Sequence, residues 1–239
     1  MRQFTRACAV LAAAGAGAQA QTINFNTLLH GEIVTSQFSP LLTVSAINPN
    51  RAFDIAAAFD TSLMGTSDPD LEGPPWSGGN LAISNTKVHL GMALIIAEND
   101  TDADFDGILD DPDDEGSRPA GQLIFDFDQA YAVFGFDVID IEGVVEESSS
   151  LEFYLGGALV ETIDFTEFTN NASSHFDASI VFGNNHANRV SPIDVAGGFD
   201  RVVINVGGSA AFDNITIPAA PTGALVALGA PLAARRRRR

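Results

Sequence analysis

Apolar and polar residues alternate with a period of two along most of this chain, in short segments bounded by Gly, Pro or Asn. This alternation places one face of a strand on a core and the other in solvent. Turn-forming residues recur roughly every eight to twelve positions, a spacing typical of an antiparallel sandwich. The pattern predicts strands within residues 22–28, 31–39, 41–47, 52–60, 81–84, 88–98, 121–128, 131–144, 151–157, 158–165, 175–183, 189–196, 199–208 and 211–217.

Residues 92–97 are almost uninterrupted in apolar character, which indicates a central strand that is buried on both faces. Between residues 21 and 217, no segment of about twelve residues keeps the period of an amphipathic helix. The chain has 17 Phe, and they recur on the predicted strands, where we expect them to fill the space between two sheets. The sequence therefore predicts one all-β domain, an antiparallel β-sandwich, over residues 21–217.

A strongly acidic insertion, residues 98–116, interrupts this pattern between two predicted strands. Ten of the eighteen residues from 98 to 115 are Asp or Glu. Five of the aspartates follow the spacing D-x-D-x-D-G-x-x-D-x-x-D, namely Asp102, Asp104, Asp106, Asp110 and Asp113. Carboxylates at loop positions 1, 3 and 5 converge on one point when the backbone turns sharply at position 6, and Ca²⁺ takes six to eight such oxygens.

The remaining loop positions fit the same interpretation. Gly107 stands at position 6, where glycine turns the backbone without steric cost. Ile108 would offer its backbone carbonyl, Leu109 would anchor the loop in apolar surroundings, and Asp110 would bind the ion directly or through water. Asp113 would supply the closing carboxylate. We therefore expect Ca²⁺ as the cofactor, and the alternative is an acidic, solvated loop that stays disordered.

An Asp at the closing position departs from the EF-hand, which ends in a longer Glu. The loop resembles the Asp-closed calcium loops of dockerins and thrombospondin type 3 repeats. No amphipathic helix flanks it, so we expect the ion to pin an excursion between two strands.

Two further polar loops carry candidate binding residues. Residues 61–80 are rich in Gly, Pro and Asp, and residues 184–189 form a short segment dense in amide groups. The first could be a second calcium site or a sugar-stacking platform, and the second could bind sugar; ordinary loop packing and a plain turn are the alternatives. The residues concerned are Asp68, Asp70, Glu72 and Trp76 in the first loop, and Asn184, Asn185 and Arg189 in the second.

The first and last strands suggest a related family. The pattern from the Ile-Asn-Phe start at residue 23 to Phe38 resembles the first strands of exported β-sandwich domains found on PEP-CTERM proteins, and the body as a whole resembles jelly-roll and galactose-binding-like sandwich domains. The closing FDNITI at residues 212–217 resembles the last strand of jelly-roll carbohydrate-binding domains. In such carbohydrate-binding domains, an Asp near the end and an acid from an early strand hold a structural Ca²⁺. The resemblance implies Asp213 as a ligand and Glu32 as its partner, whereas the alternative is an Asp that caps a turn.

Both ends of the chain carry export signals. Residues 1–20 combine a basic start, an apolar run and an A-Q-A cleavage site, which is typical of a secretory signal peptide handled by the Sec machinery. Residues 218–239 contain Pro218 and Pro221, then a short apolar helix, then the arginines 235–239 (Arg235, Arg236, Arg237, Arg238 and Arg239). This tail resembles the PEP-CTERM sorting signal of Gram-negative bacteria, with P-A-A-P in place of P-E-P. The resemblance implies an exosortase partner, transient anchoring in the inner membrane, and release to the cell surface or matrix.

Charge and missing motifs exclude several functions. The formal net charge is −19, and residues 21–217 hold 31 acids against five bases, a net of −26. Such a body repels nucleic acid and anionic lipid headgroups and attracts divalent cations. The four His are scattered, the one Cys lies in the signal peptide, and no nucleotide-binding or nucleophile-elbow motif is present.

Two functions follow as hypotheses. The first is a non-enzymatic, exported protein of the cell surface or extracellular matrix, stabilised by calcium and binding polysaccharide. The alternative is a secreted, calcium-dependent glycoside hydrolase, which needs two carboxylates about 5 to 10 Å apart. Asp137, Asp140 and Glu142 come nearest to that arrangement.

Overall fold

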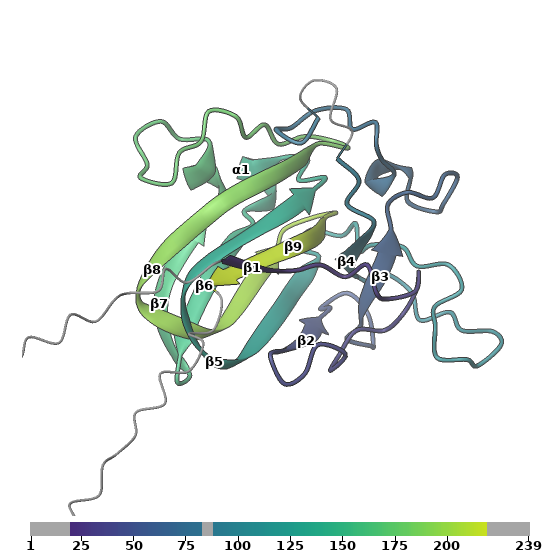
Figure 1. Cartoon of the computed structure of the whole chain (residues 1–239). Coiled ribbons are helices and arrows are strands. Elements are labelled where there is room, and N and C mark those ends of the chain that lie inside the picture. Colours follow the sequence, from purple (N-terminus) through teal and green to yellow (C-terminus); the bar gives the residue numbers. More distant parts are fainter. Residues whose placement is uncertain (1–19, 83–87, 219–239) are drawn as a thin grey trace, which may run out of the picture.

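The computed structural model describes residues 20–82 and 88–218, which fold into an antiparallel β-sandwich (Figure 1). The predicted all-β sandwich is thus confirmed. In chain order, the strands of this part of the chain are β1 (Ala20–Ile23), β2 (Leu42–Ile47), β3 (Ala56–Asp60), β4 (Met92–Ile96), β5 (Gly121–Ile139), β6 (Ser150–Leu155), β7 (Ala158–Asp164), β8 (Ala187–Val206) and β9 (Ala211–Pro218). Their order in the sheet is β3-β4-β9-β5-β8-β6-β7, with β1 paired to β9 and β2 paired to β5.

Helical structure in the described residues is limited to three short pieces. They are the 3₁₀ turn η1 (Pro69–Leu71), the helix α1 (Val144–Glu147) and the 3₁₀ turn η2 (Phe165–Phe168). No helix within these ranges has the length and apolar character that crossing a membrane requires. The predicted signal peptide and sorting tail lie outside the described residues, apart from Ala20 in β1 and Pro218 in β9.

Two long strands, β5 and β8, run side by side through the molecule (Figure 1). The sequence pattern predicts two strands in each of these regions, and the structure joins each pair into one. The ladder between β5 and β8 is interrupted by register shifts, including one between Asp126 and Tyr131. Such irregularities bend and twist a strand without ending it. They allow one edge of β5 to pair with β2 first and with β9 further along.

Most of the Phe side chains fill the main core between the layers, as the sequence predicts. Phe134 is fully buried, and its ring centroid lies 5.8 Å from that of Phe153 and 5.9 Å from that of Phe199. Aromatic pairs at such separations add to the free energy gained from burying apolar area. The core therefore provides a rigid body on which the long loops are mounted.

A second, smaller core forms on the other face of β3 and β4. Alternate residues of these strands, such as Ala58 and Leu94, contact the main core, while Phe59 and Ile95 contact the second core. Burial on both faces confirms the prediction for residues 92–97. Leu71, Trp76 and Leu109 close this second core, and they come from the 61–80 loop and the acidic insertion. Both loops are thereby packed against the same pair of strands.

Two predicted strands are not formed within the described residues, and a third, at residues 81–84, lies partly outside them, with Leu81 and Ala82 outside any strand. Residues 31–39 make only isolated bridges, because the side chain of Gln37 binds the backbone of Thr35 and Ile33 that a ladder would use. Residues 175–183 are turns and irregular backbone, and the carboxylate of Asp177 accepts hydrogen bonds from the backbone and hydroxyl of Ser179. Local side-chain bonds of this kind compete with sheet pairing.

Candidate metal centre

The first part of the acidic insertion folds into a tight, exposed loop. Asp102, Asp104 and Asp106 each place one carboxylate oxygen within 4.8 Å of the other two. The backbone turns at Gly107, whose φ of +86° lies in the left-handed region that glycine adopts at no steric cost. The carboxylate of Asp102 accepts hydrogen bonds from the backbone N–H groups of Asp106 and Gly107. The structure therefore brings together three of the predicted ligands.

The other predicted positions of this loop have different environments. Ile108 forms a bridge with Glu32, and Leu109 is buried in the second core, as expected of an apolar anchor. The carboxylate of Asp110 accepts a hydrogen bond of 2.7 Å from the backbone N–H of Ala103, which closes the loop. Asp113 does not join the carboxylates of this loop and belongs to a separate group.

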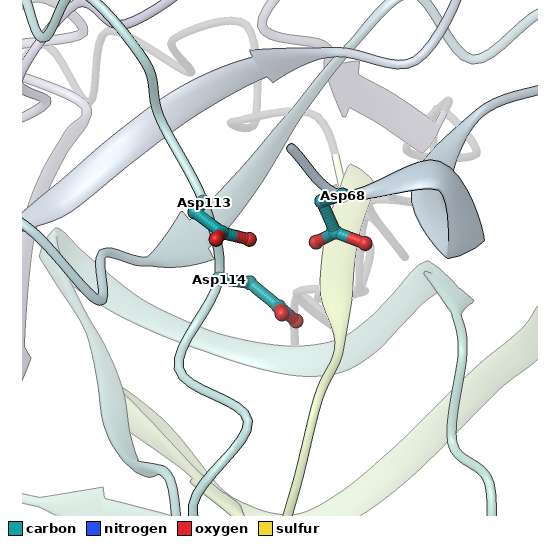
Figure 2. Close-up of side chains that lie close together, drawn as sticks. All are labelled: Asp68, Asp113 and Asp114. Atoms are coloured by element: carbon teal, nitrogen blue, oxygen red, sulfur yellow. The ribbon is translucent and has the colours of Figure 1, made fainter. Parts of the chain in front are cut away.

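Asp113 belongs to a second group of carboxylates, together with Asp68 and Asp114 (Figure 2). One oxygen from each residue lies within 4.8 Å of the others. Asp68 comes from the 61–80 loop, directly before η1, whereas Asp113 and Asp114 end the acidic insertion. A bridge between Ala97 and Asp114 holds that end beside β4. This group therefore joins two loops that the sequence treats as separate sites.

Two residues of the second group are buried, Asp113 is half-buried, and none of the three has an ion-pair partner among the described residues. Asp68 is 6% exposed and Asp114 is 5% exposed. No ion pair among the described residues involves either of them or Asp113. Burial, followed by the charges of Asp68 and Glu98, raises the pKa of Asp113 to about 6. Burial also raises the pKa of Asp68 and raises that of Asp114 well above its usual value.

The described bases of residues 21–217 form ion pairs with other acids. Lys87 lies outside the described residues, and the others form ion pairs with different acids: Arg51 with Glu98 and Glu115, Arg118 with Glu142 and Glu147, Arg189 with Asp137, and Arg201 with Asp126. None of the described bases therefore forms an ion pair with Asp68, Asp113 or Asp114.

A third group consists of Asp70, Asp140 and Glu142, again with one oxygen each within 4.8 Å. Burial raises the pKa of Asp140 to about 7, although the hydrogen bonds that it accepts from Asn185 and Ser209 act to lower this pKa. The hydroxyl of Ser209 lies 2.8 Å from Oδ2 of Asp140 and 2.9 Å from Oδ2 of Asp114. A hydroxyl has one proton, so it donates to only one of these two oxygens at a time. Ser209 thus connects the second and third groups.

Asn185 fastens the 61–80 loop beside these carboxylates. Its side-chain amide donates to the backbone carbonyls of Asp70 and Glu72, and its Oδ1 accepts from the backbone and hydroxyl of Ser77. Its own backbone N–H donates to Asp140 over 2.5 Å. Asn185 is buried with φ of +51°, a conformation that Asn tolerates better than most residues. The side chain of Asn185, which the sequence analysis offers as a sugar-binding group, therefore holds the 61–80 loop in place.

Glu72 does not join Asp68 and Asp70 in one site. Its carboxylate accepts hydrogen bonds from the backbone and the hydroxyl of Thr66. Asp68 and Glu72 flank a 3₁₀ turn and Asp70 lies within it; such a turn has about three residues per turn, so side chains two residues apart point in different directions. The loop consequently supplies Asp68 to one group and Asp70 to another.

Glu32 and Asp213 are likewise apart from each other. The carboxylate of Glu32 binds the backbone of Leu29 and the side chain of Gln37. Asp213 is fully buried in β9 opposite Asp137 of β5, and Oδ2 of Asp213 accepts a hydrogen bond from Asn214. Burial raises the pKa of Asp213 to about 8.

The remaining predicted binding residues also make internal contacts. Trp76 is buried in the second core, and its Nε1 donates to the carbonyl of Val88 over 3.0 Å. Arg189 forms a two-point ion pair with Asp137 at 2.8 Å. Asn184 is exposed, and its amide lies 3.4 Å from Glu142. The tail residues beyond Pro218, including Pro221 and the arginines 235–239, lie outside the described residues.

Asp114 and Ser209 are the site residues that sequence reasoning missed. The calcium-loop pattern ends at Asp113, so the pattern itself gives no reason to include the next residue. Ser209 lies in a turn before β9 and is 95 positions from Asp114. One feature of the sequence could have indicated Asp114. It lies near the end of the acidic run, between Asp113 and Glu115, and the run contains more acids than one ion needs.

Comparisons with known proteins show only distant similarity. No protein-family model matches this sequence, and neither does any curated protein. Among solved structures, the K2 cleaved adhesin domain of Lys-gingipain aligns with 83% of this chain and 99% of its own, at 10% identity and a TM-score of 0.41. The K1 cleaved adhesin domain of Lys-gingipain from Porphyromonas gingivalis W83 aligns with 85% of this chain and 99% of its own, at 11% identity and a TM-score of 0.30.

We predict that Asp213→Asn reduces the pH dependence of stability. The folded-state pKa of about 8 lies above the ordinary 3.8, so between these pH values unfolding releases a proton and the free energy of unfolding falls as pH rises. One such group contributes a slope of at most about 1.4 kcal/mol per pH unit. Urea unfolding is measured from pH 5 to 8 at one fixed calcium concentration. The free energy of unfolding of the variant, relative to that of the unaltered protein, should increase as the pH rises. Asp164→Asn, on the exposed side of β7, is the control, and parallel curves for Asp213→Asn would contradict the prediction.

Proposed function

We propose that this protein is an exported, non-enzymatic protein of the cell surface or extracellular matrix, whose β-sandwich is stabilised by Ca²⁺. The observation that carries the proposal is the exposed loop, in which Asp102, Asp104 and Asp106 converge around the turn at Gly107. Two ligands that each lie about 2.3 to 2.6 Å from one Ca²⁺ are at most about 5 Å apart. The separations within 4.8 Å are compatible with binding one ion.

The surrounding charge favours the same ion. The loop lies on a body with a net charge of −26 between residues 21 and 217, and its carboxylates make no described ion pair. Calcium is a hard cation that prefers carboxylate and carbonyl oxygens, which are the groups that this loop offers. An ion there would offset the repulsion between the aspartates and hold the insertion in one conformation.

The residues nearest to a glycosidase arrangement support a non-enzymatic role. Asp137 is buried in its ion pair with Arg189 and also accepts a hydrogen bond from Asn214. Asp140 is 1% exposed and holds the backbone of Asn185 and the hydroxyl of Ser209. A general acid or nucleophile must reach the substrate. These two carboxylates instead bind neighbouring parts of the protein.

Polysaccharide binding is the finer part of the proposal. Because Trp76 is buried, a sugar would need another aromatic surface, and the groove between residues 174–178 and 190–194 provides one. Phe176, which is 41% exposed, lines this groove with His175 and Asp194. An aromatic ring beside polar groups is the usual composition of a sugar-binding surface.

Export and sorting rest on the two ends of the sequence. The signal peptide of residues 1–20 directs the chain out of the cytoplasm, and the tail of residues 218–239 is handled by an exosortase. The arginines at the end would hold the tail on the cytoplasmic side of the inner membrane until it is processed. The acidic body would then be released to the surface or matrix.

Removing calcium should lower the melting temperature of the purified full chain. A ligand that binds only the folded state adds RT ln(1 + [L]/Kd), which is about 2.7 kcal/mol at a hundredfold excess over Kd. The shift should be smaller in Asp104→Asn, which removes one ligand of the loop. Asp100→Asn, an exposed acid of the same insertion outside the three groups, should keep the full shift. The same melting curve with calcium and with chelator would refute the calcium part of the proposal.

We expect the protein to bind members of a polysaccharide panel without cleaving them. Pull-down on insoluble polysaccharides measures binding, and release of reducing sugar measures cleavage. Phe176→Ala should weaken any binding, whereas Leu159→Ala, at a similarly exposed apolar position on β7, should not. Release of reducing sugar that disappears in Asp140→Asn would support the glycoside hydrolase alternative instead.

Replacing the arginines 235–239 by alanines should impair sorting. Without the basic end, the tail loses the charge that retains it on the cytoplasmic side. In a Gram-negative host that has an exosortase, cell fractionation should find less processed protein at the surface than for the unaltered chain. Detection of the unprocessed, unaltered chain in the cytosol would count against export.

A further inference from the structure

We propose that Asp68, Asp113 and Asp114 form a second calcium site, separate from the exposed loop, and that its ion fastens the 61–80 loop to the end of the acidic insertion. The inference deepens the proposed function and rests on it for the identity of the ion. Its ligands differ from those of the exposed loop, so each site can be tested without the other.

The first argument is an unsatisfied oxygen. Asp68 is 94% buried, since it is only 6% exposed, and its Oδ2 has no hydrogen-bond partner among the described residues. Figure 2 shows its carboxylate turned toward the space that Asp113 and Asp114 also face. Buried carboxylate oxygens are normally hydrogen-bonded or bound to a metal, because leaving them bare is costly. The oxygen is therefore in the position of a ligand.

The second argument is charge. Three carboxylates lie with one oxygen each within 4.8 Å of the others, and two of the three residues are buried. No described Arg or Lys pairs with them. The hydroxyl of Ser209 and the backbone N–H of Ala210, which donate hydrogen bonds to Asp114, are neutral groups. A divalent cation would supply the missing positive charge.

The third argument is the way in which the ligands are mounted. The backbone N–H of Glu98 donates to the carbonyl of Asp113, and that of Glu115 donates to the carbonyl of Ile96. These bonds hold Asp113 and Asp114 against the end of β4. Asp68 reaches them from the 61–80 loop. In the same loop, the hydroxyl of Ser67 donates a hydrogen bond to the carboxylate of Asp111 in the insertion. An ion bound by all three aspartates would lock the two loops together.

One protease can report on both sites. Chymotrypsin cleaves after large apolar residues, and Phe105 is 89% exposed in the loop of the first site. Met64, 75% exposed, and Leu63, 40% exposed, precede Asp68 in the 61–80 loop. In calcium, both regions should resist cleavage, and in chelator both should be cut, as mass spectrometry of the fragments would show.

The decisive comparison uses variants of the purified full chain, with CaCl₂ as the probe. Asp68→Asn should bind one ion fewer in isothermal titration, and it should lose calcium protection at Leu63 and Met64 while keeping it at Phe105. Asp104→Asn should show the opposite pattern. Asp100→Asn, which removes one charge from the same insertion, should keep both ions. Asp114→Asn should repeat the result of Asp68→Asn, and circular dichroism would verify that each variant is folded.

The outcomes separate this inference from the proposed function. If Asp68→Asn and Asp114→Asn bind as many ions as the unaltered chain and keep protection at Met64, the second site does not exist and the three aspartates are held by protons. If Asp104→Asn changes nothing while Asp68→Asn abolishes binding, the exposed loop is not a calcium site. MgCl₂ in place of CaCl₂ should protect neither region, because Mg²⁺ is bound poorly by such all-protein sites.

Discussion

Carboxylates that are buried close together repel one another, and each also loses its hydration. In this protein the repulsion is concentrated at one end of the sandwich, where three groups of acids gather around the 61–80 loop and the acidic insertion. The described arginines pair with other acids, so the groups of Asp102 and of Asp68 have no basic partner there. In the function proposed above, bound cations offset this charge, and the conformation of the whole loop end depends on them.

The β-sandwich makes this concentration of charge possible because its strands β3 and β4 anchor both loops through apolar contacts. The second core packs Leu71 and Trp76 of the 61–80 loop, and Leu109 of the insertion, onto β3 and β4. Glu98 and Glu115, the first and last acids of the run, both form ion pairs with Arg51, and Glu115 also accepts a hydrogen bond from Asn48. The two ends of the insertion are thus held by ion pairs with Arg51 and its interior is anchored by the burial of Leu109, while the aspartates between the ends form no described ion pair.

Much of the fold could be predicted from local pattern. The alternation at residues 42–47 and the apolar run at residues 92–97 each correspond to strands, because burial of one or both faces leaves a direct trace in sequence. Residues 31–39 and 175–183 carry a similar trace without forming strands. There, side chains such as Gln37 and Asp177 bind the backbone locally, and alternation alone does not reveal that competition.

The sequence by itself determined the all-β class, the negative charge of the body, and the convergence of Asp102, Asp104 and Asp106 around Gly107, because each depends on residues close together in the chain. Only the tertiary structure decided that Asp113 leaves that loop to join Asp68 and Asp114, that Asp70 joins Asp140, and that Trp76 is buried. The spacing of a motif fixes which residues can meet within one turn of backbone. Contacts between Asp68 and Asp113 depend instead on how two loops pack on β3 and β4, and no local pattern encodes that packing.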